Sequence, residues 1–256
     1  MSTRKPTLEE WFLAYQLRAI GKRHFHLPIF LEADVTAIVE RYRARGARPS
    51  YTALAIKALA LTARAVPSIN RCYFPTVLGD KVIEFDHISV NLPVLLREDG
   101  REHLIAETVV DAADKSVAEI HEQIRAAQKR RLAETKIAKF VAHKPNNLFW
   151  RGALKAVHFA AYNLPAIEKF GGGGLSVSSV ITHRDEGVPH ARTVAMGPTA
   201  VSLGVTGVRT DGGRIVLEMG MGLDHAAVSG IEARRATDAL YDLFTSKSPE
   251  VLQCFD

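Results

Sequence analysis

Apolar residues recur at intervals of three and four along much of this chain, which is the spacing of one face of an α-helix. Two of these stretches open on Thr/Ser-x-x-Glu, at Thr7–Glu10 and Ser116–Glu119, a pattern that caps the first backbone N–H groups of a helix. Residues 51–65 are apolar almost throughout, which predicts a helix buried on most sides. The predicted helices are 8–20, 35–45, 51–65, 117–133 and 231–244, with a further helical region over 134–170 that Pro145 and Pro165 interrupt.

Other stretches are typical of strands, because they end at turn signals and are rich in β-branched and aromatic residues. The predicted strands are 24–33, 82–85, 88–96, 103–110, 175–181, 199–209 and 214–223. Asp99-Gly100 and Asp211-Gly212-Gly213 favour tight hairpins. The four-glycine run 171–174 lacks the spacing of a phosphate-binding loop, so we interpret it as a turn. Helices mixed with hairpins predict one α+β domain, a mixed β-sheet with flanking helices.

Composition narrows the classes of function. With 256 residues, 47% of them hydrophobic and 24% charged, the chain can bury a core without disulfides or metal. Cys72 and Cys254 form no Cys-x-x-Cys pair and the N-terminus has no apolar signal core, so we expect a cytoplasmic protein. No apolar run reaches the length of a membrane span. The net charge of +5, without basic stretches interleaved with aromatics, argues against nucleic acid and fits a basic surface or a phosphate-bearing ligand.

The strongest candidate for chemistry is the segment 222–230, Gly-Leu-Asp-His-Ala-Ala-Val-Ser-Gly. A strand ends in Asp224-His225, and a helix begins a few residues later. Rigid elements on both sides hold such a junction in place, and a histidine there can exchange a proton near neutral pH. His24 and His26 lie at strand spacing as well, but a pair without a third ligand nearby is more typical of a surface or a core than of a metal site.

This segment and its surroundings resemble a known family. Asp224-His225, followed by Gly230, is similar to the signature of the dihydrolipoyl acyltransferase catalytic domains of 2-oxo acid dehydrogenase complexes and, more distantly, of chloramphenicol acetyltransferase. Ser229 departs from the signature, which has Asp or Asn at that place. Further similar segments follow in the family's order, at 30–36, 52–61, 66–70, 87–94, 115–120, 176–179 and 198–205.

The resemblance implies a chloramphenicol acetyltransferase-like fold, with 1–24 as an N-terminal helix and lead-in and 25–256 as the catalytic domain. It implies CoA-dependent acyl transfer with His225 as general base, the Ser178 hydroxyl as oxyanion donor, and Ser229 at the loop position that supports them. Coenzyme A or its acyl thioester is then a substrate, no metal takes part, and no covalently bound lipoyl group belongs to this chain. The family forms homotrimers with active sites between subunits, and CoA and the acceptor enter from opposite ends of a channel.

Two questions stay open at the level of sequence. The acyl acceptor is either a small molecule with a thiol, hydroxyl or amine, or a lipoyl group on a separately encoded carrier. The alternative to an enzyme is a catalytically degenerate family member that acts as a binding or scaffold subunit, and the serine at position 229 is its main support.

Overall fold

The computed structural model describes residues 4–76, 79–98, 100–135, 144–163, 173–183, 194, 197 and 199–256. Its helices are α1 (Leu8–Arg23), α2 (Thr36–Ala44), α3 (Tyr51–Ala65), α4 (Val117–Gln128), α6 (Leu148–Asn163), α7 (Gly230–Thr245) and α8 (Pro249–Gln253), with 3-10 turns at Pro67–Ile69 and Leu132–Glu134. Its strands are β1 (His26–Asp34), β2 (Arg71–Thr76), β3 (Gly79–Glu84), β4 (Val90–Glu98), β5 (Arg101–Val109), β6 (Leu175–His183), β7 (Val201–Asp211) and β8 (Arg214–Asp224).

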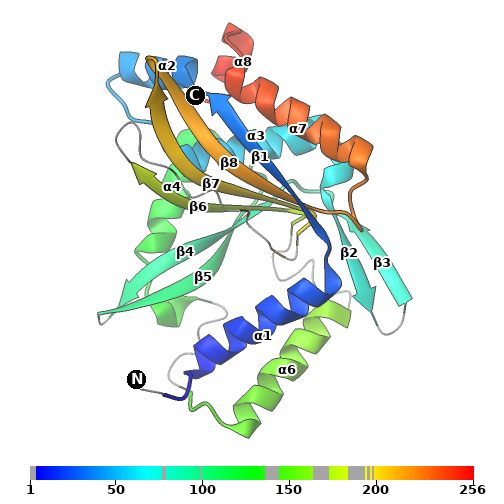
Figure 1. Ribbon diagram of the computed structural model, residues 1–256. Coiled ribbons are helices and arrows are strands. Elements are labelled where there is room, and N and C mark those ends of the chain that lie inside the picture. Colours follow the sequence, from blue (N-terminus) through cyan, green and yellow to red (C-terminus); the bar gives the residue numbers. More distant parts are fainter. Residues whose placement is uncertain are drawn as a thin grey trace.

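A six-stranded sheet in the order β1-β8-β7-β6-β4-β5 runs through the molecule (Figure 1). β6 is parallel to both of its neighbours, β4 and β7, and the remaining neighbours are antiparallel. The turns of the two hairpins contain Gly100, Gly212 and Gly213, all at positive φ, which glycine adopts without strain. The expected mixed sheet and α+β class are therefore confirmed.

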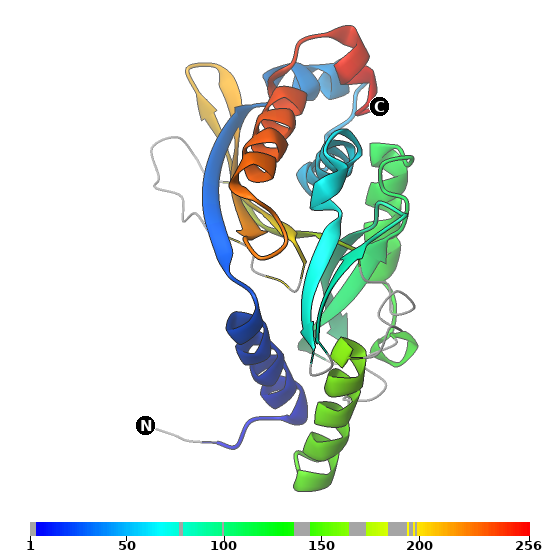
Figure 2. The ribbon, with the colours of Figure 1, turned by 90° about the vertical axis from the view of Figure 1, so that its right-hand side faces the viewer.

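Helices α3, α4 and α7 cover one face of this sheet and share the main core with it (Figures 1 and 2). Ser50 caps α3 by accepting a hydrogen bond from the Ala53 N–H, and Leu54, Ile56 and Leu59 of α3 are fully buried. α3 is buried on most sides, as its composition predicts. This helical layer covers one face of the sheet and leaves the other face and the strand ends uncovered.

The central strands present small and polar side chains on the face away from this helical layer. Leu175 and Val177 of β6 belong to the core, so strand alternation turns Ser176 and Ser178 to the other face. Ser202 of β7 is aligned with Ser176 in the parallel pair and shares that face. Hydroxyl groups thus collect on the side of the sheet that α3, α4 and α7 do not cover.

Helices α1 and α6 form a pair apart from the helical layer, beside one end of the sheet (Figure 2). Leu8 and Phe12 of α1 pack with Leu154 of α6 in a small second core. Trp150 of α6 packs against this second core as well. Pro145, one of the two predicted interruptions, lies in non-helical backbone just before α6, and the other, Pro165, lies outside the described residues.

Two elements were missed by the sequence analysis. β2 pairs with β3 in a separate two-stranded ribbon, in which Cys72 and Phe74 are buried. The strand is short and contains Pro75, and proline removes a ladder donor, so the local pattern is weak. α8 has five residues, with Ser248 as its cap and Pro249 in its first turn, and is too short for a periodic signal.

The end of the glycine run has a packing role that the turn interpretation did not include. A Cβ added at Gly174 would lie 2.6 Å from the backbone nitrogen of Arg71, and one at Gly173 would lie 2.3 Å from the carbonyl oxygen of Ser89. Both distances are far below van der Waals contact, so only glycine lets β6 begin against the starts of β2 and β4.

Candidate active site

The chain leaves β8 at Asp224 and turns sharply before α7 begins at Gly230. The backbone N–H groups of Ala227 and Val228 both donate to the Asp224 carbonyl oxygen, at 2.9 and 2.8 Å. The His225 N–H donates to the Phe25 carbonyl oxygen at 2.7 Å, which ties the turn to the segment that enters β1. The backbone of the predicted catalytic segment is therefore held on several sides.

The ring of His225 has a defined orientation in this turn. His225 is an exposed residue in the single chain, and its Nδ1 lies 3.0 Å from the Val228 carbonyl oxygen. A carbonyl oxygen can only accept, so Nδ1 carries the proton in this bond. In the neutral ring, Nε2 then keeps its lone pair, which is the state that a general base requires.

Asp224 is buried beside His225 and is satisfied by three donors. His24 Nδ1 donates to its Oδ2 at 2.7 Å, and the backbone N–H groups of Phe25 and Ala226 donate to its Oδ1 at 3.2 Å. Burial acts to raise the pKa of the Asp224 carboxyl, but the hydrogen bonds from His24 and Ala226 outweigh it and hold that pKa below its usual range. An ionised carboxylate thus adjoins His225, and the donors to that carboxylate join β8 to the residues before β1.

Ser229 is the N-cap of α7. Its Oγ accepts from the Glu232 N–H at 3.4 Å, and the Glu232 carboxylate accepts from the Ser229 N–H at 2.8 Å, which completes a capping box. Arg71 of β2 donates through Nη2 to both Glu232 oxygens, at 3.0 and 2.8 Å, and through Nε to the Ala227 carbonyl at 2.6 Å. The turn is thereby fastened to α7 and to the β2–β3 ribbon.

Ser178 lies on β6 and is not brought near His225 within one chain. It is aligned with Gly204 on β7, which in turn is paired with Gly220 on β8, whereas His225 follows β8 five positions further along. At about 3.3 Å per residue and about 4.8 Å between strands, the two Cα atoms are on the order of 19 Å apart. A site that uses both residues therefore needs Ser178 from one copy of the chain and His225 from another.

A cluster of hydroxyl groups lies nearer to the turn than Ser178 does. Ser176 Oγ donates to Ser202 Oγ at 2.8 Å, and the Thr199 hydroxyl lies 2.9 Å from the former and 3.0 Å from the latter. Ser202 is completely buried and is paired with Gly222 on β8. These three hydroxyls link the starts of β6 and β7 to each other, on the face that also carries Ser178.

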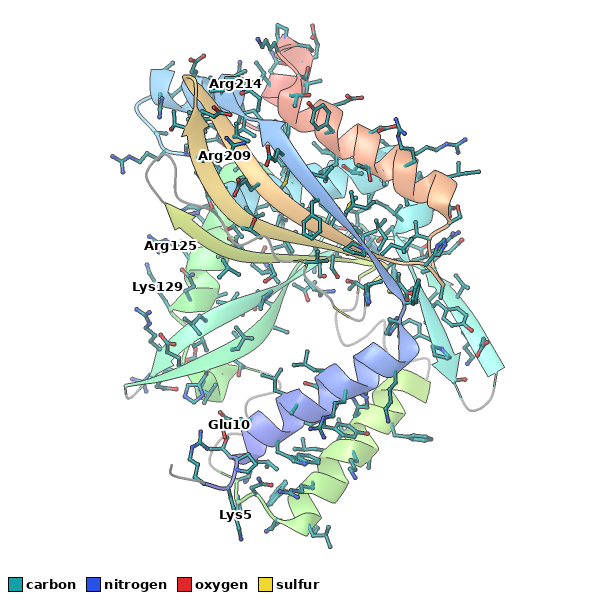
Figure 3. The ribbon with its side chains drawn as sticks, viewed as in Figure 1. Lys5, Glu10, Arg125, Lys129, Arg209 and Arg214 are labelled. Carbon is teal, nitrogen blue, oxygen red and sulfur yellow. The ribbon has the colours of Figure 1, made fainter. Side chains whose placement is uncertain are left out.

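Two arginines at one end of the sheet are candidates for binding a phosphate-bearing ligand. Arg209 and Arg214 lie at the β7–β8 hairpin, which is the end of β8 opposite His225 (Figure 3). Arg209 is bound there by Glu32, Asp211 and Glu218. Arg209 is therefore engaged in ion pairs rather than available to a phosphate group.

Three residues around the turn were missed by the sequence analysis in their present roles: His24, Arg71 and Glu232. The Ser-x-x-Glu pattern of Ser229 and Glu232 is visible in the sequence and could have identified the capping box. His24 and Arg71 lie about 200 and 150 positions from the turn, and no local pattern announces their contacts. His24 lies in the core, one of the two places expected for it.

Comparison with solved structures identifies the fold. The catalytic core of the 2-oxoacid dehydrogenase complex of Thermoplasma acidophilum aligns with a TM-score of 0.62 at 15% identity, over 95% of this chain and 98% of that one. Dihydrolipoamide acetyltransferase of Azotobacter vinelandii aligns with a TM-score of 0.62 at 17% identity, over 96% and 92%. A probable dihydrolipoamide acetyltransferase of Listeria monocytogenes gives 0.62 at 16% identity, over 100% and 96%. The expected acyltransferase fold is confirmed over nearly the whole chain.

Sequence comparison adds nothing to this result. No family model matches the chain, and no curated protein matches it. Over the part of the chain that the structure describes, no helix has the length and apolar character needed to cross a membrane. Within the same residues, no three side chains of His, Cys, Asp or Glu gather as a metal site would require.

Proposed function

We propose that this protein transfers an acyl group between a coenzyme A thioester and a thiol, hydroxyl or amine acceptor. The observation that carries the proposal is the hydrogen bond from His225 Nδ1 to the Val228 carbonyl oxygen, which leaves Nε2 as a base in an exposed turn. The fold supports the same chemistry, because solved structures that share it are dihydrolipoamide acetyltransferases.

In the proposed reaction His225 Nε2 takes the proton of the acceptor as the acceptor attacks the thioester carbonyl carbon. A thiol gains most from this step, since the thiolate is the nucleophilic form. The carbonyl becomes a tetrahedral oxyanion, and the Ser178 hydroxyl donates a hydrogen bond to it. Collapse of this intermediate breaks the bond to sulfur, and the CoA thiolate recovers the proton from the His225 imidazolium. No acyl-enzyme forms in this mechanism, so neither Ser178 nor Ser229 acts as a nucleophile.

The site is proposed to lie between two copies of the chain. Its support is the separation of Ser178 from His225 along and across the sheet, on the order of 19 Å within one chain. A closed trimer, the assembly implied by the family resemblance, would bring the His225 turn of each copy to the Ser178 face of its neighbour. Head-to-tail contacts that close into a ring repeat the same site at every interface.

The test is a screen of acyl-CoAs against thiol, hydroxyl and amine acceptors, with release of the CoA thiol as the readout. Wild type should release thiol with at least one pair, and His225→Ala should reduce the rate by about 10²–10⁴-fold with the fold intact. His87→Ala is the matched control, since the His87 side chain is 75% exposed and is paired with Asp111. Equal rates in wild type and folded His225→Ala would refute the mechanism, and an inactive wild type would favour the scaffold alternative.

The identity of the acceptor is a separate question within this proposal. Free dihydrolipoamide, a reduced lipoyl domain supplied as a second protein, and simple thiols can be compared in the same assay. A lipoyl domain that gives a much higher kcat/KM than free dihydrolipoamide would identify a carrier-borne acyl group. Equal values would indicate a small-molecule acceptor, because binding energy from the remote protein surface would then contribute nothing.

A further inference from the structure

The Glu232 carboxylate is connected to the His225 ring through a single peptide group. The carbonyl oxygen of Val228 accepts from His225 Nδ1 at 3.0 Å, and the N–H on the other end of that peptide, on Ser229, donates to Glu232 Oε2 at 2.8 Å. The path therefore runs from imidazole to carbonyl, across one amide, and from its N–H to a carboxylate.

From this geometry we propose that Glu232, held by Arg71, acts through the 228–229 peptide to orient His225 and to strengthen it as a base. It would thereby supply the negative charge that Ser229 does not provide. The proposal rests on the proposed function, in which His225 is the base. Glu232 is a positioning residue here, because it touches neither the substrate nor the atoms that react.

The physical reason is the polarisation of an amide that is bonded at both ends. A carboxylate that accepts from the N–H shifts electron density toward the carbonyl oxygen, which then becomes a better acceptor. A stronger bond from Nδ1 fixes the ring in the tautomer with Nε2 free, and it stabilises the imidazolium that forms when Nε2 takes a proton. The effect has the same sign as a direct carboxylate–imidazole contact, and it is weaker because a peptide lies between.

The contacts of Arg71 separate this arrangement from an ordinary helix cap. A capping box needs only the serine and the glutamate. Here Arg71 grips both oxygens of Glu232 and also the Ala227 carbonyl, so the carboxylate and the adjoining peptide are fixed from a different part of the fold. The side chains of Arg71 and Glu232 are 22% and 20% exposed, which shields their charges from solvent more than at the open surface.

Other charged and titratable groups surround the turn and act on the same ring. Asp224 ends β8 just before His225, and buried His24 donates a hydrogen bond to its carboxylate. His26 of β1 donates from Nε2 to the Gly197 carbonyl oxygen at 3.1 Å, because that oxygen can only accept. Among the described residues, the charged and titratable groups around the turn include Asp224, His24, His26, Arg71 and Glu232, and Cys72 and Tyr73 of β2 also interact with Asp224. Substitutions at Glu232 and Arg71 leave the first three in place.

The experiment follows the titration of His225 in two independent ways. One is the pH dependence of kcat/KM. The other is an NMR titration of the histidine ring signals, with the His225 signal assigned by its loss in His225→Ala, and this readout needs no activity. Glu232→Gln keeps an acceptor for the cap but removes the charge, so both titration midpoints should fall by about half a pH unit and kcat should fall about tenfold with little change in KM.

Arg71→Gln should move both midpoints in the opposite direction, because it removes a positive charge and leaves the carboxylate. A residue with a purely structural role would lower activity in both variants without opposite shifts. Glu119→Gln is the matched control, since Ser116 and Glu119 form the same capping box on α4, which packs against α3, β4 and β5. It should lose similar stability and move neither midpoint.

The two proposals fail in different ways. A folded Glu232→Gln protein whose His225 signal titrates as in wild type overturns the proposed action of Glu232 on His225, whatever its activity. If Arg71→Gln does not fold, this single variant is decisive. A shifted NMR midpoint in a protein that transfers no acyl group supports the action of Glu232 on His225 and refutes the proposed function.

Discussion

Ser178 and Ser179 are neighbours on β6, and strand alternation turns them to opposite faces. In the proposed mechanism the Ser178 hydroxyl donates to the oxyanion. We therefore expect Ser178→Ala to lower kcat about 10²-fold with little change in KM, as for an interaction made in the transition state. Ser179→Ala serves as the control and should be much milder. Steady-state kinetics of both variants separates the two roles, and a rise in KM alone for Ser178→Ala would make Ser178 a substrate contact.

Ser229 is the residue at which this chain departs from the family signature, and its capping role gives a quantitative expectation. Ser229→Ala should cost about 1 kcal/mol in the free energy of unfolding, measured by chemical denaturation, because the first turn of α7 loses its cap. Ser229→Asp should be tolerated, since Asp caps as well as Ser. A slow wild type that Ser229→Asp accelerates would show instead that position 229 must carry charge.

At this scale the sequence can propose some residues of the candidate site and cannot propose others. His225 and Ser229 belong to one short segment, so local spacing and a family resemblance are enough to find them. His24 and Arg71 contribute through distant contacts with Asp224 and Ala227 that exist only after the sheet has formed. The offset between Ser178 and His225 is likewise a property of strand register, which sequence patterns do not specify.

The junction of β8 with the segment before β1 depends on the buried pair of His24 and Asp224. Because burial is outweighed by hydrogen bonds, the pKa of Asp224 lies below its ordinary value of 3.8 in the folded protein. A lowered folded-state pKa gives a stabilisation that is complete above about pH 4 and is lost as pH falls through the folded value.

Asp224→Asn should therefore be less stable than wild type at neutral pH by about 3 kcal/mol, as for loss of one partner of a buried pair. Denaturation curves recorded near neutral pH and in acid provide the check. The difference in unfolding free energy between the two proteins should shrink in acid. A difference that stays constant, or that grows as the pH falls, would contradict the role assigned to the ionised carboxylate.

Elements with a strong periodic signal were predicted well, and the others depend on tertiary contacts. α3 and the β7–β8 hairpin carry continuous apolar or alternating patterns with clear caps and turns. β2 has two buried residues and a proline, and it is stable as a strand because β3 pairs with it. The apolar residues of α1 and α6 pack against each other in the second core, which explains why these two helices lie apart from the helical layer.

The assembly can be tested on the whole molecule by light scattering at micromolar concentration, where we expect a trimer or a multiple of it. Mixing His225→Ala with Ser178→Ala chains, after partial dissociation, gives a sharper result. If each site takes His225 from one copy and Ser178 from the next, about a quarter of the sites become intact after random mixing. An active monomer, or no recovery of activity in confirmed mixed trimers, would refute the shared site.

If the proposed site forms between copies in a trimer, the offset of Ser178 from His225 along the sheet has a genetic consequence. A chain that carries both His225→Ala and Ser178→Ala would inactivate two sites, one that uses its His225 turn and one that uses its β6. A single defective copy in a ring of three therefore leaves one working site. Activity in cells that express both alleles should then fall as the square of the fraction of normal chains. Loss-of-function alleles at these two positions are expected to be dominant negative when combined in one gene, and to complement each other when carried on separate genes.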